Sequence, residues 1–120
     1  MLFKLSCTHI SKIIIIHMSY KLRFVQIFKQ EKIKEYLAIE QQFARMEVQY
    51  PEFPKGKRYL PCTGREASNT LIWESHFETL KAAQHALAFL PEDSRHEGLF
   101  QIQSEFILGT YTEIYKPFDS

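Results

Sequence analysis

Apolar and polar positions along the chain follow two different periods. Four segments are predicted as strands, because their side chains divide between two opposite faces: residues 20–28, 57–63, 69–77 and 106–115. Two further segments have the spacing of three and four residues that gives a helix one apolar face: residues 31–50 and 78–90. Pro51 and Pro91 follow these stretches and end the helices. The predicted order is strand–helix–strand–strand–helix–strand.

Short local patterns place the starts of the later helices and the faces of the last strand. Ser75 followed by Glu78 is a capping-box pattern, so the second helix should begin there. Ser94 with Glu97 repeats the pattern and predicts a short third helix. In the last strand, alternation puts Phe106, Leu108 and Ile114 opposite Ile107, Tyr111 and Tyr115.

This order predicts an α+β fold of ferredoxin-like βαββαβ topology. Two strand–helix–strand units with right-handed crossovers give a four-stranded antiparallel sheet with both long helices on one side. Pro61 favours an edge position for the second strand, because proline cannot donate to the strand ladder. The opposite face of the sheet still carries apolar residues, and a large apolar face is normally an interface. We therefore expect a homodimer closed sheet to sheet, a dimeric α/β barrel.

The first seventeen residues, MLFKLSCTHISKIIIIH, differ from the rest of the chain. Their apolar run, Ile13 to Ile16, is shorter than the roughly 7 to 15 residues of a signal peptide and is followed by His17. We expect residues 1–17 to be a leader or disordered tail and residues 18–120 to form the domain. The alternative is an additional strand, since four consecutive isoleucines favour extended structure.

Composition narrows the partners of this domain. The chain has 120 residues, 45% of them hydrophobic, which is one ordinary globular domain. Its 15 basic residues are dispersed among 14 acidic ones, so no basic surface for nucleic acid is expected. No apolar stretch approaches the roughly 18 residues of a membrane-spanning helix. Cys7 and Cys62 lie far apart without a metal-binding spacing, which suits a reducing cytoplasm.

Four ionisable residues stand out as candidates for chemistry. Glu40 and Glu47 fall within the apolar arc of the first helix, where a buried carboxylate needs a partner or acquires the raised pKa of a general base. The alternative is that the arc is wider than the contact surface and both reach solvent. Glu74 and His76 share one strand face, as a proton-transfer pair, as metal ligands or as a hydrogen-bonded surface pair.

Residues 69–75 of the third strand, Asn-Thr-Leu-Ile-Trp-Glu-Ser, carry a family resemblance. The segment resembles the Trp-x-Ser strand of the dimeric α/β-barrel superfamily. That group includes antibiotic-biosynthesis-type and haem-degrading monooxygenases, stress-response barrel proteins and NIPSNAP-like proteins. The resemblance extends over most of residues 18–118 through the order of elements. It implies a dimer with a pocket between each sheet and its own helices.

The resemblance also implies roles for two residues of that strand. Cofactor-free quinone-forming members use an asparagine and a tryptophan four residues apart, and Asn69 and Trp73 match that spacing. Residues four apart share a strand face, so both are expected to reach one pocket. The tyrosine and arginine of such members fall on Thr79 and Asp93 in this chain. Taken without the resemblance, Trp73 is a core residue and Asn69 a turn residue.

These features together predict a pocket for a small apolar or aromatic molecule, with no cofactor and no metal. The enzyme hypothesis is cofactor-independent oxygenation of an aromatic or polyketide-like substrate. Its candidate catalytic residues are Asn69, Trp73, Glu40 and His76. The candidate ligand-binding residues are Tyr36, Phe43 and Tyr111. The alternatives are a non-catalytic ligand-binding or stress-response barrel and a purely structural dimerisation module.

Overall fold

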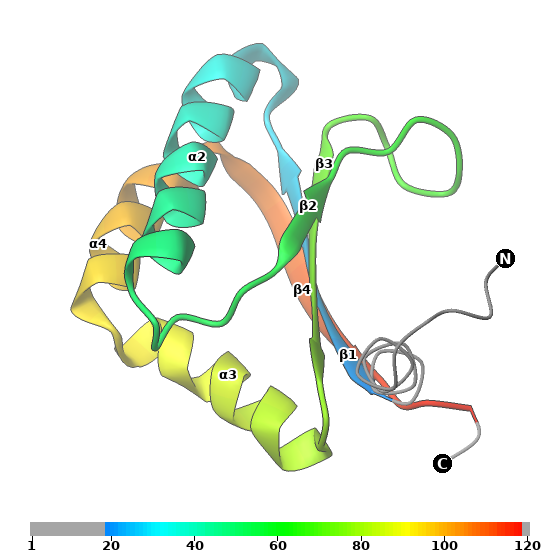
Figure 1. Ribbon diagram of the computed structural model, residues 1–120. Coiled ribbons are helices and arrows are strands. Elements are labelled where there is room, and N and C mark those ends of the chain that lie inside the picture. Colours follow the sequence, from blue (N-terminus) through cyan, green and yellow to red (C-terminus); the bar gives the residue numbers. More distant parts are fainter. Residues whose placement is uncertain (1–18, 119–120) are drawn as a thin grey trace, which may run out of the picture.

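The computed structural model describes residues 19–118, and its elements follow the predicted order (Figure 1). The strands are β1 (Tyr20–Phe28), β2 (Lys57–Tyr59), β3 (Thr70–Phe77) and β4 (Ile107–Tyr115). The α-helices are α2 (Ile33–Gln49), α3 (Leu80–Glu92) and α4 (Ser94–Gln103). Short 3-10 turns, Gln30–Lys32 and Ser104–Phe106, precede α2 and β4. Residues 1–17, predicted as a leader, lie outside the described residues.

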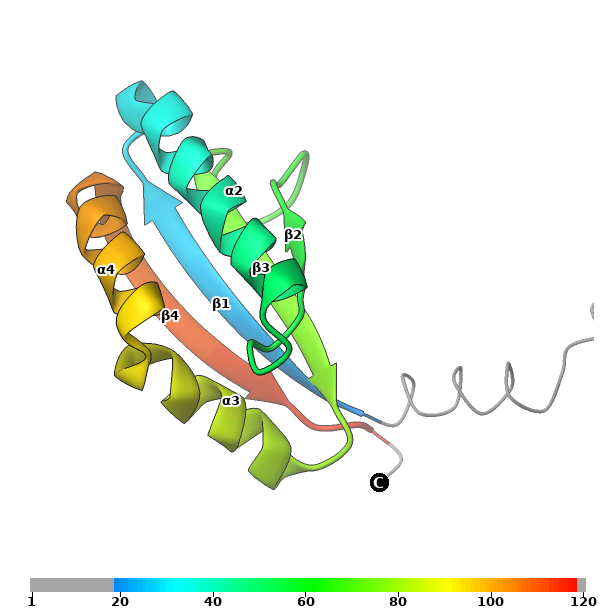
Figure 2. The ribbon, with the colours of Figure 1, turned by 60° about the vertical axis from the view of Figure 1, so that its left-hand side comes forward.

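The strands form one antiparallel sheet in the order β2-β3-β1-β4, and the helices all cover the same face of it (Figures 1 and 2). The predicted α+β, ferredoxin-like fold is therefore confirmed. β2 is the predicted edge strand, but it ends at Tyr59, before Pro61. We refer to the two sides of the sheet as the helical face and the open face.

The core lies between the helical face and the helices in two clusters of buried side chains. One joins Leu22, Trp73 and Ala86, and thus β1, β3 and α3. The other consists of Phe28, Tyr36 and Leu71, where the ring of Tyr36 on α2 stacks on Phe28 with centroids 4.5 Å apart. Burial of large apolar side chains is the main force that holds the helices on the sheet.

Both predicted helix caps are wrong in position. Ser75 lies within β3, where its hydroxyl donates to the carbonyl of Lys55. The cap of α3 is Thr79, whose Oγ1 accepts from the backbone N–H of Ala82 at 3.0 Å. The cap of α4 is Asp93, one residue before the predicted Ser94. A capping pattern recurs easily by chance among serines and glutamates, so tertiary packing decides which residue is used.

The predicted faces of β4 are wrong at the N-terminal end of that strand. The pairing of β1 with β4 shifts between Ile27 and Phe28, so Ile27 lies opposite Gly109 and Phe28 opposite Ile107. A bulge of this kind interrupts the alternation of side chains. As a result, Ile107 packs against the second core cluster, while Leu108 is 63% exposed.

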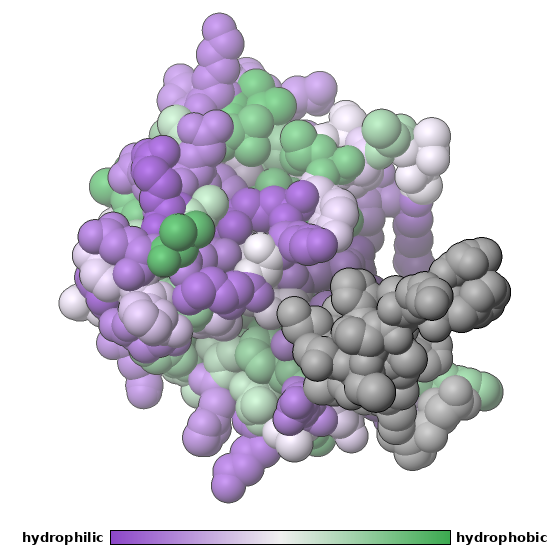
Figure 3. Space-filling model, viewed as in Figure 1, coloured by the Kyte–Doolittle hydropathy of each residue, from purple (hydrophilic) through white to green (hydrophobic). Residues whose placement is uncertain are grey.

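The open face is more polar than its apolar pattern suggested. Arg23 at its centre pairs with Glu74 at 3.0 Å and with Glu113 at 2.7 Å, and Lys21 lies 3.5 Å from Glu74. Exposed aromatic residues lie around this cluster: Tyr59, Tyr111 and Tyr115. The outer surface of α2 and α4 is dominated by hydrophilic residues (Figure 3). No helix within residues 19–118 is long and apolar enough to span a membrane.

Candidate functional site

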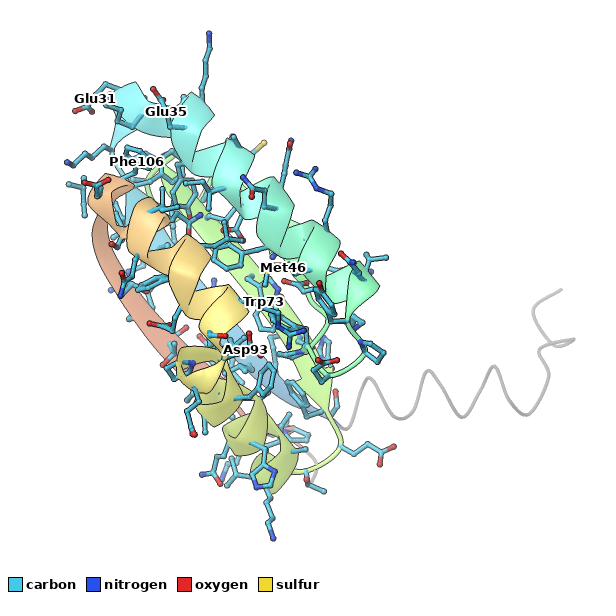
Figure 4. The ribbon with its side chains drawn as sticks, turned by 90° about the vertical axis from the view of Figure 1, so that its left-hand side faces the viewer. Glu31, Glu35, Met46, Trp73, Asp93 and Phe106 are labelled. Atoms are coloured by element: carbon cyan, nitrogen blue, oxygen red, sulfur yellow. The ribbon has the colours of Figure 1, made fainter. Side chains whose placement is uncertain are left out.

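A cavity of about 60 Å³ lies between the helical face of the sheet and the helices. Every layer of the fold contributes to it: the three strands β1, β2 and β3, the helices α2, α3 and α4, and the loop after α2. Its lining residues are Phe24, Gln26, Glu40, Phe43, Glu47, Phe53, Pro54, Arg58, Leu71, Trp73, Leu90, His96, Phe100 and Gln103. Figure 4 shows Trp73 in the gap between α2 and α4.

Aromatic rings make up much of the wall. Phe24 on β1 and Trp73 on β3 stack with ring centroids 5.0 Å apart and planes inclined by 25°. Across the cavity, the imidazole of His96 lies between two phenyl rings, 5.0 Å from Phe43 and 6.0 Å from Phe100. Stacked and tilted pairs at these separations are attractive beyond the area that they bury. These contacts fix the wall residues in place.

An ion-pair network forms the polar side of the cavity. Arg58 of β2 donates from Nε to Glu40 Oε2 at 2.7 Å and from both terminal nitrogens to the carboxylate of Glu47. Gln103 of α4 donates from Nε2 to the other oxygen of Glu40 at 2.9 Å. One guanidinium therefore ties the edge strand to two successive turns of α2, and through Gln103 to α4.

Burial and charge act against each other on Arg58. Burial by itself lowers the pKa of the guanidinium, but the hydrogen bond to Glu47 and the charge of Glu40 raise that pKa above its ordinary value. Arg58 therefore stays charged, and its two bonds to Glu47 have the bidentate geometry that suits guanidinium and carboxylate. Of the two glutamates predicted in the apolar arc, Glu40 is buried and Glu47 is half-buried, and both have Arg58 as their partner.

Two further donors converge on Glu47 Oε1. The indole Nε1 of Trp73 and the backbone N–H of Gly56 both lie 3.4 Å from it. Gly56 passes so close to the indole that a Cβ on this residue would lie 2.2 Å from Trp73 Cε2. Only glycine permits this approach of backbone to ring. Trp73 is thus fixed between Phe24, Gly56 and the carboxylate of Glu47.

Three of the predicted site residues line this cavity: Trp73, Glu40 and Phe43. Asn69 does not line it, because its amide donates to the backbone carbonyl of Phe28 at 2.7 Å, at the end of the neighbouring strand. Tyr36 is fully buried beside the cavity, and its hydroxyl donates to Gln26 Oε1 at 2.5 Å. Burial raises the pKa of the Tyr36 phenol, and the charge of Glu40 raises it further.

The other two predicted site residues lie on the opposite side of the sheet. His76 is exposed, and its Nδ1 lies 2.9 Å from the hydroxyl of Ser19, whereas Glu74 pairs with Arg23. Tyr111 donates to Glu66 at 2.7 Å on the open face. The structure therefore does not bring His76 or Tyr111 together with Trp73. Their predicted roles would require a second site on the open face.

Sequence reasoning missed Arg58, His96 and Gln103. Arg58 was overlooked because a basic residue on a short edge strand usually faces solvent. One signal was present, since two glutamates in an apolar arc require a cationic partner. Neither His96 nor Gln103 carries a pattern that would place it at a cavity, because α4 has no clear apolar face. Within residues 19–118, no group of His, Cys, Asp or Glu side chains is arranged to hold a metal ion.

The fold is shared with solved structures of low sequence identity. A NIPSNAP family protein from Agrobacterium tumefaciens superposes with a TM-score of 0.68 at 18% identity, over 86% of this chain and 89% of that one. A putative antibiotic biosynthesis monooxygenase from Nitrosomonas europaea gives 0.62 at 10% identity, over 84% and 91%. A conserved protein from Methanosarcina mazei gives 0.63 at 12% identity, over 87% and 97%.

A scan against protein-family models and a search of curated proteins both gave no match. At 10% to 18% identity the structural likeness establishes the ferredoxin-like fold and no particular activity. The neighbours are NIPSNAP family proteins and antibiotic biosynthesis monooxygenases, as the resemblance of the third strand indicated.

Proposed function

We propose that the protein is a small-molecule-binding dimeric α/β barrel whose ligand enters the cavity between the sheet and the helices. The observation that carries this proposal is the position of Trp73. Its indole lines a cavity that is walled by aromatic rings and bordered by the ion pairs of Arg58 with Glu40 and Glu47. Ligand sites are typically apolar concavities with a few placed polar groups, and this cavity has that composition.

The size of the cavity limits the ligand. Pockets that enclose drug-sized molecules measure roughly 300 to 1,000 Å³, and an apolar cavity of about 150 Å³ holds one benzene ring. At about 60 Å³, this cavity encloses a small molecule or one end group of a larger one. Because the space is open to solvent, the remainder of a larger ligand would extend outward.

Cofactor-independent oxygenation is the second candidate. It is favoured by Trp73 at the cavity and by the structural likeness to proteins called antibiotic biosynthesis monooxygenases. Two observations weigh against it. Asn69 is committed to a backbone carbonyl, and each carboxylate oxygen of Glu40 and Glu47 already accepts a hydrogen bond. A carboxylate paired in this way is a weak general base. We therefore favour binding over catalysis.

The dimer of this proposal would form through the open face. That face exposes Tyr59, Tyr111 and Tyr115, and tyrosine is enriched in protein interfaces. Arg23 and Lys21 balance the charges of Glu74 and Glu113 within one protomer, so a second protomer can cover them without leaving a charge unpaired.

The binding proposal is tested with the fluorescence of Trp73, the single tryptophan of the chain. Small neutral fragments such as methanol and ethanol are titrated against the protein while the emission is recorded. Occupation of the cavity should shift the emission with saturation, because the indole lies in its wall. Substituting Leu90→Phe, which enlarges another side chain of the lining without adding a tryptophan, should remove the saturable response of a fragment. A response that persists in this variant would place binding elsewhere.

A further inference from the structure

The cavity is lined by both charged side chains and aromatic rings, and its charges do not sum to zero. The charged side chains in its lining are Glu40, Glu47 and Arg58. Two negative charges and one positive charge leave these three side chains with a net charge of −1. Within the described lining there is no lysine and no second arginine. An anionic ligand would therefore meet repulsion in this cavity, whereas a cationic one would neutralise it.

The charge of Arg58 is already balanced within the protein. Its Nε is bonded to Glu40, and its two terminal nitrogens are bonded to Glu47. A ligand carboxylate or phosphate would add a third negative charge beside this one guanidinium, so it would be repelled by both glutamates. The arginine thus acts as part of the wall and not as an anion-binding group.

Much of the remaining wall is aromatic. Five aromatic side chains line the cavity: Phe24, Phe43, Phe53, Trp73 and Phe100. An ammonium group is attracted to aromatic rings by their quadrupole, and rings grouped around one site are the usual receptor for methylated ammonium ions. One of these rings already accepts a cation, since Arg95 Cζ lies 4.8 Å from the centroid of Phe53.

Arg95 adds no net positive charge to the surroundings of the cavity. It is paired with Asp93 at 2.7 Å and with Glu52 at 2.9 Å, so this group of three also has a net charge of −1. The volume of the cavity, about 60 Å³, is less than the space that benzene requires, so only the end group of a ligand would lie inside it.

We propose that the cavity takes the head group of a small organic cation, a protonated or quaternary amine. This inference rests on the proposed function, because it names the chemical class of ligand for the same cavity. A methylated ammonium would contact the aromatic rings through its methyl groups, while its charge would be balanced by the excess negative charge of Glu40 and Glu47.

The test compares two probes of the same shape and different charge. Choline and 3,3-dimethyl-1-butanol differ only in the central atom of the head group, which is a charged nitrogen in one and a neutral carbon in the other. Binding of each to the full chain is measured by calorimetry, with sodium chloride added to equal ionic strength. We expect choline to bind at least about tenfold more tightly, a difference of the size that cation–aromatic attraction provides.

Three variants refine the test. Gln26→Glu keeps the oxygen that accepts from Tyr36 and makes the lining more negative, so choline affinity should rise several-fold. Glu47→Gln makes the lining neutral, so choline affinity should fall towards that of the neutral probe. Glu74→Gln, on the open face, should leave both affinities unchanged.

The outcomes separate this inference from the proposed function. Equal or tighter binding of the neutral alcohol would overturn the cation proposal and leave a binding site for neutral molecules. Failure of both probes to bind would also overturn it, and the small-molecule proposal would then depend on whether any other compound is found bound to the purified protein. Unchanged choline affinity in both Gln26→Glu and Glu47→Gln would show that it binds away from the cavity.

Discussion

At the scale of single residues, Gly56 determines the position of Trp73. Gly56→Ala would place a Cβ 2.2 Å from Trp73 Cε2, and the indole cannot retreat because Phe24 stacks on it. We expect a loss of about 1 to 3 kcal/mol in the free energy of unfolding, the usual cost of overpacking, and a shifted tryptophan emission. Chemical denaturation followed by fluorescence measures both effects.

Gly98 provides the matched control. It lies in α4 with no atom within 4 Å of an added Cβ. Gly98→Ala should therefore stabilise the protein by up to about 1 kcal/mol through helix propensity, with unchanged emission. Equal effects of the two substitutions would contradict the close approach of Gly56 to the indole.

Arg58 is the residue on which the polar side of the cavity depends. Arg58→Ala would leave Glu40 and Glu47 buried without a cation, which typically costs about 3 kcal/mol or more. Lys57→Ala, at the exposed neighbouring position of β2, should change stability by less than about 0.5 kcal/mol. Thermal denaturation of both variants tests this. A small effect of Arg58→Ala would mean that the network is not formed in solution.

The site shows which residues can be predicted from sequence and which cannot. Trp73, Glu40 and Phe43 were predicted because strand alternation and helical spacing state which face a residue occupies. The same rule was used to place Asn69 and Tyr111 at the cavity. The rule does not determine which group a side chain bonds to, and both side chains bond to groups outside the cavity. Arg58 and His96 come to the cavity only through tertiary packing, which no local pattern encodes.

At the scale of elements, Asp93 lies between α3 and α4 and caps both helices. Its carboxylate caps α4 by accepting from the backbone N–H groups of Arg95 and His96 at 2.9 and 3.2 Å, and it pairs with the Arg95 side chain. Asp93→Ala should destabilise the protein by about 1 kcal/mol at neutral pH, a typical cost of losing an N-cap. Thermal denaturation at pH 7 gives the difference.

The same residue predicts a dependence on pH. The hydrogen bond from Arg95 holds the pKa of Asp93 at about 2, below its ordinary 3.8. A lowered pKa means that Asp93 stabilises the fold above about pH 4 and that this contribution is lost as pH falls towards 2. The stability difference between the wild type and Asp93→Ala should therefore shrink over that interval. A difference that stays constant down to pH 2 would contradict the assignment.

Elements were predicted better than their ends. β1 extends over the predicted residues 20–28, and α2 over most of residues 31–50, because long periodic segments leave little freedom of assignment. The ends depend on side-chain bonds with several competitors, so Thr79 and Asp93 were missed as caps. The bulge beside Phe28 was also missed, and it reversed the faces of Ile107 and Leu108.

At the scale of the whole molecule, the open face is the proposed dimer interface. Tyr111→Lys keeps a partner for Glu66 and so should leave the protomer folded, but it would place a charge in the proposed interface. We expect sedimentation at micromolar concentration to show a wild-type dimer and a dissociated variant. Ile102→Lys, on the exposed surface of α4, should remain dimeric. A monomeric wild type would refute the dimer.

The fold follows from the order of elements, whereas the proposed function depends on whether one cavity holds a ligand. The most direct test is native mass spectrometry of the purified full-length protein beside the Phe43→Trp variant. We expect a small additional mass on the wild type that is released on denaturation and is absent from the variant. A wild type without any bound mass, or the same mass on both proteins, would contradict the proposal that this cavity binds a small molecule.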